Sequence, residues 1–469
     1  MADAFDPWQS AAIAADVVAA GASPQALAQR RASRLATLLR AARRRSPLCR
    51  EMLAPYGDLA GVALQDLPVM RKPQLMARFD DWVGDRALSL PALRRFVADR
   101  TRIAQPFLGR YTVWESSGSS GEPGLFVQDP QAMAVYDALE AWRRPLVRPL
   151  LRLVDPLYLG ERIAFVGAID GHFATTVSLQ RLRRLNPAWG AVLRFVSFLQ
   201  ATPALVAALD AYRPTIVATY PSAAVMLAQE HRVGRLRHAP AEVWMGGETL
   251  TPAMRRFVTE TFGCAVVNSY GASEFLALAS ECSHGSLHLN SDWAILEPVD
   301  GAGRPVPAGE TGSTALLTNL ANHVQPLIRY DLGDRVTLRP QGCACGSARP
   351  VVEVEGRCDD TLYVPAAQGG RVSILPLAVC TVLEEAAGLF DFQLVQVRPG
   401  RLVLSTAQPG RTGDDALQRA RASLAAFLSA QGAPHVQIAC RHAGPDVRGR
   451  SGKVQRVVSL VAPHRAATP

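Results

Sequence analysis

The amino-acid sequence predicts an α/β protein that has a large N-terminal domain of mixed sheets and helices and a small α+β C-terminal domain. Short apolar runs at 162–168, 214–220, 241–247 and 264–271 alternate with helical patterns, which is typical of a largely parallel sheet. From about residue 290 the sequence changes to Pro- and Gly-rich strands and turns, and beyond residue 356 a separate set of strand and helix patterns begins. A chain of 469 residues is also too long for a single core.

Composition and charge exclude several classes of protein. With 48% hydrophobic and 19% charged residues the chain is expected to be globular, and its eight cysteines do not resemble a disulfide scaffold. The net charge of +9 comes from scattered arginines rather than a basic patch, so we expect no nucleic-acid partner. MADAFDPWQS lacks the basic n-region of a signal peptide, and no uncharged apolar run reaches the roughly 18 residues of a membrane span. We therefore expect a cytoplasmic protein.

The first predicted element is an amphipathic helix over 32–53, with Leu35, Leu38, Leu39 and Ala42 on one face. Further along, TPALVAALDAYR and SAAVMLAQEHRV are expected to be helices between the strands of the sheet. In the C-terminal unit, RLVLSTA and HVQIACR read as strands and DDALQRARASLAAFL as a helix. Core packing alone explains these patterns.

The stretch ESSGSSGEPGLF at 115–126 is the first that suggests chemistry. Serine and glycine at this density let a backbone bend around an anion and direct amides and hydroxyls toward it. A phosphate-binding loop usually carries a lysine, but Gly124 stands where one is expected, and the absence of G-x-x-x-x-G-K-[ST] argues against a P-loop ATPase. Only two of the fifty basic residues are lysines, Lys72 and Lys453.

Five more polar or Gly-rich stretches follow predicted strands, open a connection or lie near the end of the chain. Ligands in α/β sheets gather at loops after the carboxyl ends of strands, so these stretches are candidates for one site. They are GGETL (246–250), NSYGASE (268–274), RYDLGD (329–334), GRCDD (356–360) and RSGKVQR (450–456). Each is weak evidence alone, and their order carries the information.

This ordered series resembles the adenylate-forming superfamily of acyl-CoA synthetases, and most closely its phenylacetate-CoA ligase-like branch. RRRSPLCREM, LPVMRKPQLMARFDDWV and the ending G-K-x-x-R-V support the resemblance, which spans about residues 30–460. It implies that ATP and a carboxylic acid give an acyl-adenylate and pyrophosphate. A thiol, either CoA or the phosphopantetheine arm of an acyl carrier protein, then displaces AMP.

The resemblance also assigns the nucleotide contacts. The phosphates would lie on Ser116, Ser117, Gly118, Ser119, Ser120 and Gly121. Tyr270 would pack on adenine, Glu274 would associate with Mg²⁺, and Asp334 would accept hydrogen bonds from the ribose hydroxyls. Further nucleotide contacts are expected from Gly247, Glu248, Gly271, Ser273 and Arg357.

Two residues near the end of the chain complete the implied catalytic cycle. Asp359 falls on the hinge (357–360) about which a mobile lid domain (361–469) would turn against the large domain (1–356). Lys453 would reach the carboxylate and the α-phosphate during adenylation, where a preorganised cation contributes about 10²–10³ in rate. Lys453 would therefore supply the positive charge that the Ser/Gly loop lacks.

The sequence departs from the family pattern at two places. Asp331 stands in Y-D-L-G-D where a basic residue is common after the tyrosine, and Ser119–Ser120 replaces the commoner Thr-Thr. The second change keeps the hydroxyls. The acidic residue at 331 leaves the charge next to this tyrosine undecided, but it does not alter the expected reaction.

A Cys/His group suggests a structural zinc site. Thiolates and imidazoles are the ligands that zinc prefers, and a closed site needs four of them. ECSHGSLH and GCACG supply candidates, of which we select Cys282, His288, Cys343 and Cys345, with His284 as the spare. The alternative is a reduced cysteine cluster without metal.

The predicted function is an ATP-dependent ligase for a small, aromatic carboxylic acid, and the chain is a candidate homodimer. An acid pocket is expected, from positions after strands, near His172, Phe173, Tyr220, Pro221, Gly246 and Ala272. The alternative is a nucleotide-binding protein of the same fold, without ligase activity, in a regulatory or assembly role. The presence of Lys453 favours the enzyme.

Overall fold

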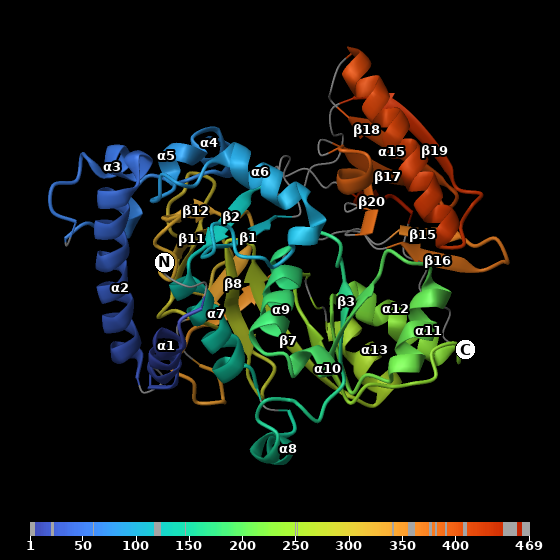
Figure 1. Cartoon of the computed structure of the whole chain (residues 1–469), viewed down its shortest axis with the longest axis horizontal. Coiled ribbons are helices and arrows are strands. Elements are labelled where there is room, and N and C mark those ends of the chain that lie inside the picture. The colour runs from blue at the N-terminus through green and yellow to red at the C-terminus, as the bar shows by residue number, and fades with distance from the viewer. Residues whose placement is uncertain are drawn as a thin grey trace.

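The computed structural model confirms the α/β class and the small C-terminal domain (Figure 1). It describes residues 5–19, 23–59, 61–116, 123–145, 147–248, 250, 252–339, 342–354, 362–374, 378–379, 382–389, 392–406, 410–443 and 457–461. The predicted hinge lies outside these ranges, so the boundary at 356–361 stays a prediction. Among the described helices, none is both long and apolar enough to cross a bilayer.

The N-terminal region is helical and packs along one side of the large domain (Figure 1). Its helices are α1 (Pro7–Ala19), α2 (Pro24–Arg45), α3 (Pro47–Leu53), α4 (Lys72–Ala77), α5 (Phe79–Trp82) and α6 (Leu90–Ala98), with short 3₁₀ turns at Leu64–Asp66 and Arg100–Arg102. The single helix predicted over 32–53 is wrong in one respect. It breaks at Ser46, which caps the end of α2 and whose Oγ accepts a hydrogen bond from the Cys49 amide, because Pro47 cannot continue the helix.

A nine-stranded mixed sheet forms the centre of the large domain, in the order β13-β14-β9-β8-β7-β6-β5-β3-β4. The four apolar runs are confirmed as strands. The parallel strands are β3 (Ile163–Gly167), β4 (Leu193–Ser197), β5 (Ile216–Thr219), β6 (Glu242–Met245) and β7 (Ala265–Ala272). The antiparallel half adds β8 (Phe275–Glu281), β9 (Leu287–Leu289), β13 (Val336–Arg339) and β14 (Val351–Val354).

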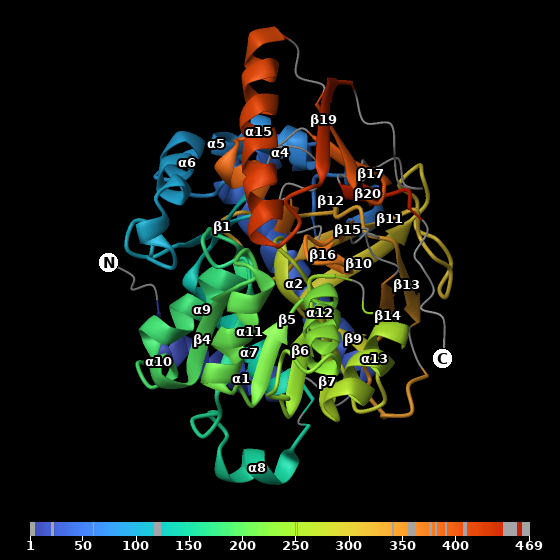
Figure 2. The same ribbon diagram turned by 90° about the vertical axis from the view of Figure 1, so that its right-hand side faces the viewer.

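Helices cover both faces of the parallel strands (Figure 2). One face packs on α11 (Thr202–Tyr212), α12 (Pro221–Arg232) and α13 (Pro252–Phe262), in the same apolar cluster as the C-terminal domain. The other face lies against α9 (Ala174–Leu185) and α10 (Trp189–Val192), with a much smaller buried cluster. Before these come α7 (Pro130–Arg143) and the projecting α8 (Pro149–Val154).

Two smaller sheets complete the large domain. The hairpin of β1 (Thr112–Glu115) and β2 (Leu125–Gln128) flanks the Ser/Gly stretch. A three-stranded sheet contains β10 (Ala294–Val299), β11 (Thr314–Asn319) and β12 (Tyr330–Asp331), as the strand-and-turn texture predicts. The hairpin therefore places both ends of the Ser/Gly loop side by side.

The C-terminal domain has a four-stranded sheet with one long helix. Its elements are β15 (Leu362–Pro365), β16 (Arg371–Ile374), a π-helical turn at Val382–Ala386, β17 (Gln393–Arg398), β18 (Arg401–Thr406), α15 (Gly410–Ala430), β19 (Gln437–His442) and β20 (Val457–Ser459). The predicted strands and helix of this unit are confirmed. Gln431 joins the domains, because its Nε2 donates to the Gln200 carbonyl at 2.8 Å.

Candidate functional site

A cleft with a volume of about 1240 Å³ runs through the large domain at the ends of the parallel strands. Most of the described residues predicted for the site line it, although they come from six separate segments of the chain. They are Ser116, Phe173, Tyr220, Gly246, Gly247, Glu248, Tyr270, Gly271, Ala272, Ser273, Glu274 and Asp334. The fold therefore brings the predicted nucleotide and acid contacts to one place.

The Ser/Gly loop is closed at its base by Ser116. The Ser116 Oγ accepts a hydrogen bond from the Gly124 amide at 2.8 Å, and the Ser116 amide donates to the Gly124 carbonyl at 2.8 Å. Ser117, Gly118, Ser119, Ser120 and Gly121 lie outside the described residues. The predicted phosphate loop thus begins at the wall of the cleft, directly after β1.

Tyr270 and Asp334 are in direct contact. The Tyr270 hydroxyl donates a hydrogen bond to Asp334 Oδ2 at 2.8 Å, and the tyrosine is nine-tenths buried. Sixty-four residues separate them in the chain. The side chains predicted to hold adenine and ribose, the two joined halves of a nucleoside, therefore stand next to each other.

Two glycines let the backbone approach the site closely. A Cβ on Gly271 would stand 2.0 Å from the Leu276 carbonyl oxygen, so no other residue fits at this register shift near the end of β7. Gly247 has φ of +80°, and a Cβ there would meet the Tyr220 ring at 3.0 Å. The conformations of both loops thus depend on glycine.

The turn after Gly271 is fixed by side chains from outside it. Trp114 Nε1 donates to the Ser273 carbonyl at 2.8 Å, and Asn319 Nδ2 donates to the Glu274 carbonyl at 2.9 Å. With its backbone held in this way, Glu274 lies on the cleft wall, where its carboxylate offers the oxygen ligands that Mg²⁺ prefers.

Asp331, the residue that departs from the family pattern, has a structural task. Its Oδ1 accepts hydrogen bonds from Thr314 Oγ1 at 2.6 Å and from the Gly333 amide at 3.0 Å. The carboxylate therefore shapes the turn that presents Asp334.

His172 and Pro221 do not line the cleft, which corrects the predicted acid pocket. His172 is fully buried, with its Nε2 3.2 Å from the Asp99 carbonyl and its ring edge-on to Phe96. Burial lowers the pKa of this histidine, so it is a neutral core residue. Pro221 starts α12 and packs in its first turn, as proline commonly does.

Three predicted residues, Arg357, Asp359 and Lys453, lie outside the described residues. Their roles as nucleotide contact, hinge and catalytic cation therefore stay predictions.

Lys72 lines the cleft, although no functional role was predicted for it from the sequence. It begins α4 and lines the cleft together with Arg71. A Cβ on Gly124 would stand 3.2 Å from Lys72 Cδ, so the lysine stem lies against the far limb of the Ser/Gly loop. The sequence feature that could have identified this residue is the rarity of lysine in an arginine-rich chain.

The predicted metal ligands form a compact cluster. One ligand atom each from Cys282, His288, Cys343 and Cys345 lies within 4.8 Å of all the others. Cys282 Sγ is 3.6 Å from Cys343 Sγ, and Cys345 Sγ is 3.3 Å from His288 Nε2. Two thiolates bound to one tetrahedral zinc lie about 3.8 Å apart, so the spacing fits such an ion. His284 is not in this group.

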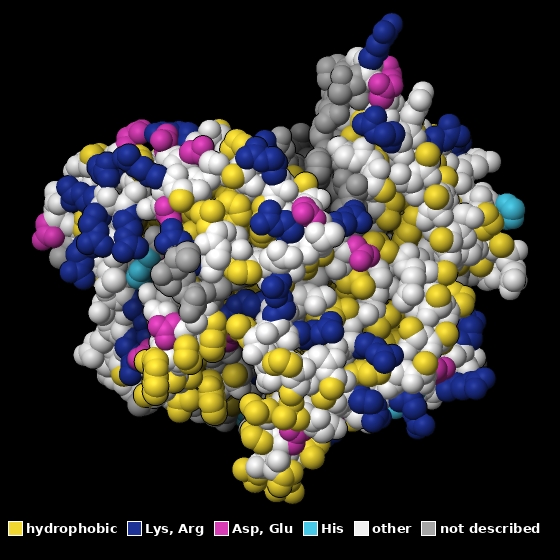
Figure 3. Space-filling view, in the orientation of Figure 1, with side chains coloured by type: hydrophobic (Ala, Val, Ile, Leu, Met, Phe, Trp, Pro, Cys, Tyr) yellow, Lys and Arg dark blue, Asp and Glu magenta, His cyan; other side chains and the backbone are white. Residues whose placement is uncertain are grey.

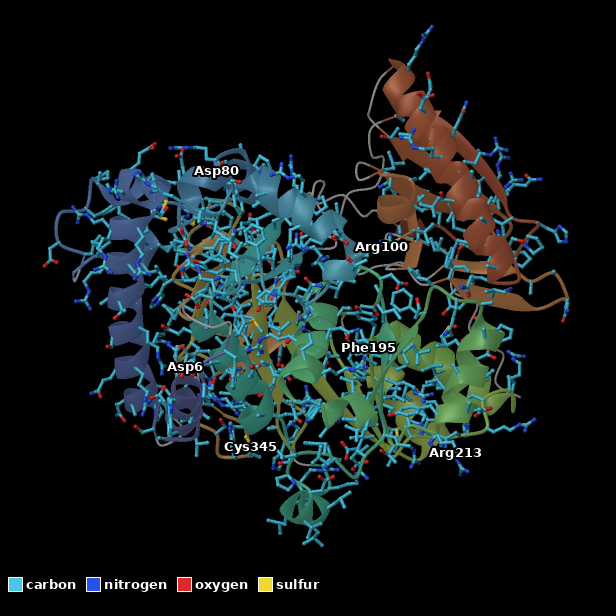
Figure 4. All side chains as sticks on the ribbon, viewed as in Figure 1. Asp6, Asp80, Arg100, Phe195, Arg213 and Cys345 are labelled. Carbon is cyan, nitrogen blue, oxygen red and sulfur yellow. The ribbon has the colours of Figure 1, made fainter. Side chains whose placement is uncertain are left out.

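The surroundings of the cluster suit a metal as well. His288 Nδ1 is 2.9 Å from the Arg349 carbonyl, which leaves Nε2 for the ion. A hydrogen bond from the Cys345 amide is the main cause that lowers the pKa of the Cys343 thiol to about 6. Cys345 lies at the lower edge of the large domain, far from the C-terminal domain (Figure 4). The cluster therefore lies next to β9 and β14, on the side of the large domain away from the C-terminal domain.

Comparison with known proteins agrees with this geometry. The AMP-binding enzyme family model matches residues 188–313, which include the Gly246–Glu248 and Tyr270–Glu274 loops. This stretch of the chain is therefore similar to AMP-binding enzymes. The chain is 32% identical over 204 residues to a phenylacetate-coenzyme A ligase of Thermus thermophilus, a match that covers 41% of this chain and 44% of that ligase.

Solved structures of a CoA ligase share the architecture over nearly the whole chain. A 2-hydroxyisobutyryl-CoA ligase in complex with 2-HIB-AMP and CoA, in the thioesterification state, has a TM-score of 0.54 and 19% identity, over 92% of this chain and 89% of that one. The same ligase in the postadenylation state gives 0.52 and 19%, over 93% and 89%. At this identity the likeness establishes the fold alone.

Proposed function

We propose that this protein is an ATP-dependent acid–thiol ligase that forms an acyl-adenylate. The observation that carries the proposal is the contact between Tyr270 and Asp334 in a cleft that also contains Ser116 and Glu274. The match of residues 188–313 to the AMP-binding enzyme family model and the partial match to a phenylacetate-coenzyme A ligase support it. The small aromatic acid and the choice between CoA and a carrier protein stay predictions from the sequence.

The first step joins two anions. A carboxylate oxygen attacks the α-phosphorus of ATP, a new P–O bond forms, and the bond to pyrophosphate breaks. In the second step a thiol sulfur attacks the acyl carbon, the thiol loses its proton, and AMP leaves with the carboxylate oxygen. Bound Mg²⁺ would screen the polyphosphate charge, and Glu274, which lines the cleft, would be the residue that holds it.

The chain's own residues would position the nucleotide for this attack. Asp334 would accept hydrogen bonds from the ribose hydroxyls, and the Tyr270 hydroxyl orients that carboxylate. Phe173 and Tyr220 line the neighbouring part of the cleft, where the carboxyl end of the acid would enter beside Gly246. The amides and hydroxyls of the Ser/Gly loop would hold the phosphates.

Two cations would serve the phosphates at different stages. Lys72 lies at the loop and is supplied by the large domain, so it is present whatever the position of the C-terminal domain. Lys453 would arrive with the C-terminal domain only for adenylation. A compact ammonium on a flexible stem suits both tasks.

The Cys/His cluster is proposed to hold a structural Zn²⁺. Four protein ligands leave no open position for catalysis, and the cluster ties the 282–286 turn to the 343–345 turn. Gly285 and Ser286 of the first turn line the cleft, so the ion would fix part of its wall.

The test is a pyrophosphate-release screen with ATP and Mg²⁺ over benzoic, phenylacetic, hydroxybenzoic and fatty acids. We expect release only when an acid is present, and a thioester when CoA or a phosphopantetheine carrier is added. Lys453→Ala should lose release but still form thioester from supplied acyl-adenylate. Tight ATP binding with no acid-dependent release would favour the alternative, a nucleotide-binding protein without ligase activity.

A further inference from the structure

The short helix α8 (Pro149–Val154) turns its charged side chains inward. Arg148, directly before the helix, donates a hydrogen bond to Glu161 Oε1 at 2.7 Å. Arg148 also pairs with Glu242, and Arg152, which is buried, pairs with the same Glu161. Two buried carboxylates at the amino ends of β3 and β6 therefore fasten this helix by its arginines.

The outward side of α8 and of the turn after it is apolar. Leu150, Leu153 and Val154 are each about 80% exposed, and Leu157 is 55% exposed. These side chains form what we call the apolar knob, which projects from the large domain (Figure 3). A surface helix of a globular protein normally turns its charges to water and its apolar side to the core. The reversed arrangement in α8 indicates that an apolar partner covers the knob.

Five arginines near the knob form what we call the basic cluster: Arg162, Arg183, Arg184, Arg194 and Arg213. The turn that follows α8 runs directly into Arg162, whose Nε donates to the Arg213 carbonyl at 2.7 Å. The Arg194 guanidinium lies 4.5 Å from the centre of the Tyr212 ring. Burial raises the pKa of that tyrosine hydroxyl, and the charges of Arg194, Arg162 and Arg183 act against the rise. These arginines therefore share one neighbourhood.

The charge of the basic cluster is not neutralised within the part of the chain that the structure describes, where no carboxylate forms an ion pair with any of its arginines. Carboxylates beside the knob are already occupied, because Glu161 and Glu242 hold α8. Asp155 accepts hydrogen bonds from the Leu159 amide at 2.7 Å and from the Gly160 amide at 2.9 Å. The cluster therefore presents positive charge to a partner.

The knob and the basic cluster lie at the same end of the parallel strands. Arg162 precedes β3, Arg194 is the second residue of β4 and Arg213 precedes β5, so all three mark amino ends of strands. Gly246, in contrast, directly follows the carboxyl end of β6. Figure 4 shows Arg213 on the lower side of the large domain, the side from which α8 projects, away from the C-terminal domain. One broad partner could therefore touch both the knob and the cluster.

An anionic lipid bilayer fits both parts of this surface. Leucine and valine side chains gain free energy at the boundary of headgroups and acyl chains, and arginines beside them attract the lipid phosphates. A nucleic acid would bind the arginines but would leave the knob in water. A second copy of the chain, docked through the same surface, would bring the arginines of one basic cluster against those of the other. A folded protein would need a pocket shaped to the knob, whereas a fluid bilayer needs none.

We propose that the apolar knob and the basic cluster dock this protein on an anionic membrane surface. Leu150, Leu153 and Val154 would enter the boundary between headgroups and acyl chains, and the arginines would lie at the level of the phosphates. Among the described helices none can span a bilayer, so the attachment would be peripheral. It does not depend on the proposed ligase activity and can be tested without any substrate.

Co-sedimentation of the full chain with vesicles tests the proposal. We expect binding to vesicles of an equal mixture of phosphatidylcholine and phosphatidylglycerol, and much weaker binding to phosphatidylcholine alone. Leu153→Asp should lower the partition coefficient for the mixed vesicles about 10-fold or more, because it places a charge where an apolar side chain would be buried. Arg184→Gln combined with Arg194→Gln should lower it about fivefold for each arginine, and added salt should weaken binding as well.

Matched controls come from the C-terminal domain. Leu460→Asp and Arg401→Gln change exposed side chains there, and both variants should bind vesicles as the parent does. The thermal midpoint of each variant shows whether it is folded. If Leu153→Asp does not fold, Leu150→Ala combined with Leu153→Ala takes its place, since it removes apolar surface without adding a charge.

Three results would overturn the proposal. The first is a folded parent that binds neither kind of vesicle. The second is vesicle binding that persists unchanged in folded Leu153→Asp and in the arginine variant. The third is self-association of the parent, abolished by Leu153→Asp and without vesicle binding, which would assign the knob to a second copy of the chain.

Discussion

The two faces of the parallel sheet are built from the same strands but differ in how they are filled. Val166, Val217 and Val243 point into a core shared with α11, α12 and α13, and each is at most 3% exposed. Their neighbours Phe165, Ala218 and Trp244 point to the other side and line the cavity. Because side chains alternate along a strand, one segment can stabilise the fold and shape a binding site at once.

The loops after the strands form a third region, which borders the cleft. Tyr270, Asp334 and Ser116 occupy it, together with glycines that permit close backbone approach. The comparison thus predicts two kinds of mutational effect: loss of chemistry at the strand ends and loss of stability on the packed face.

The largest effect is expected at the strand ends. Lys72→Ala should lower acid-dependent pyrophosphate release about 10²–10³-fold, because a cation beside the phosphate loop is removed. Lys72→Arg should recover part of the rate, since it restores charge with another shape. The thermal midpoint should hardly change. Full activity of Lys72→Ala would show that the phosphates do not depend on this lysine.

Metal removal tests the antiparallel half of the sheet, where no substrate contact is proposed. Cys345→Ser, or dialysis against a chelator, should lower the free energy of unfolding by about 3 kcal/mol, because one of four ligands or the ion is lost. Cys440→Ser, an exposed cysteine outside the cluster, is the control. Metal analysis should find one zinc per parent chain. Absence of bound metal together with unchanged stability would reduce the cluster to packed cysteines.

A smaller effect is expected on the packed face. Val217→Ala should cost about 2 kcal/mol of unfolding free energy, because it removes buried methyl groups and leaves a cavity. Denaturant unfolding measures this cost, and kcat/KM for each acid should stay within about twofold at a temperature where the variant is folded. A larger loss of kcat/KM in folded Val217→Ala would break the distinction between the packed face and the site.

The sequence predicted the sheet well, because buried parallel strands such as 162–168 read as continuous apolar runs. Family resemblance assigned Tyr270 and Asp334 to one nucleotide, but their direct hydrogen bond is a finding of the structure, since no local pattern relates residues so far apart. His172 was misplaced because it follows a strand, yet its side chain turns toward Phe96.

Isotope transfer tests the central claim most directly. The carboxylic acid is labelled with ¹⁸O in both oxygens and incubated with ATP, Mg²⁺ and CoA, and the products are analysed by mass spectrometry. The account predicts AMP carrying one ¹⁸O atom, because the carboxylate oxygen that attacks the α-phosphorus leaves with AMP. Unlabelled AMP, or ADP formed regardless of the acid, would contradict the proposed acyl-adenylate.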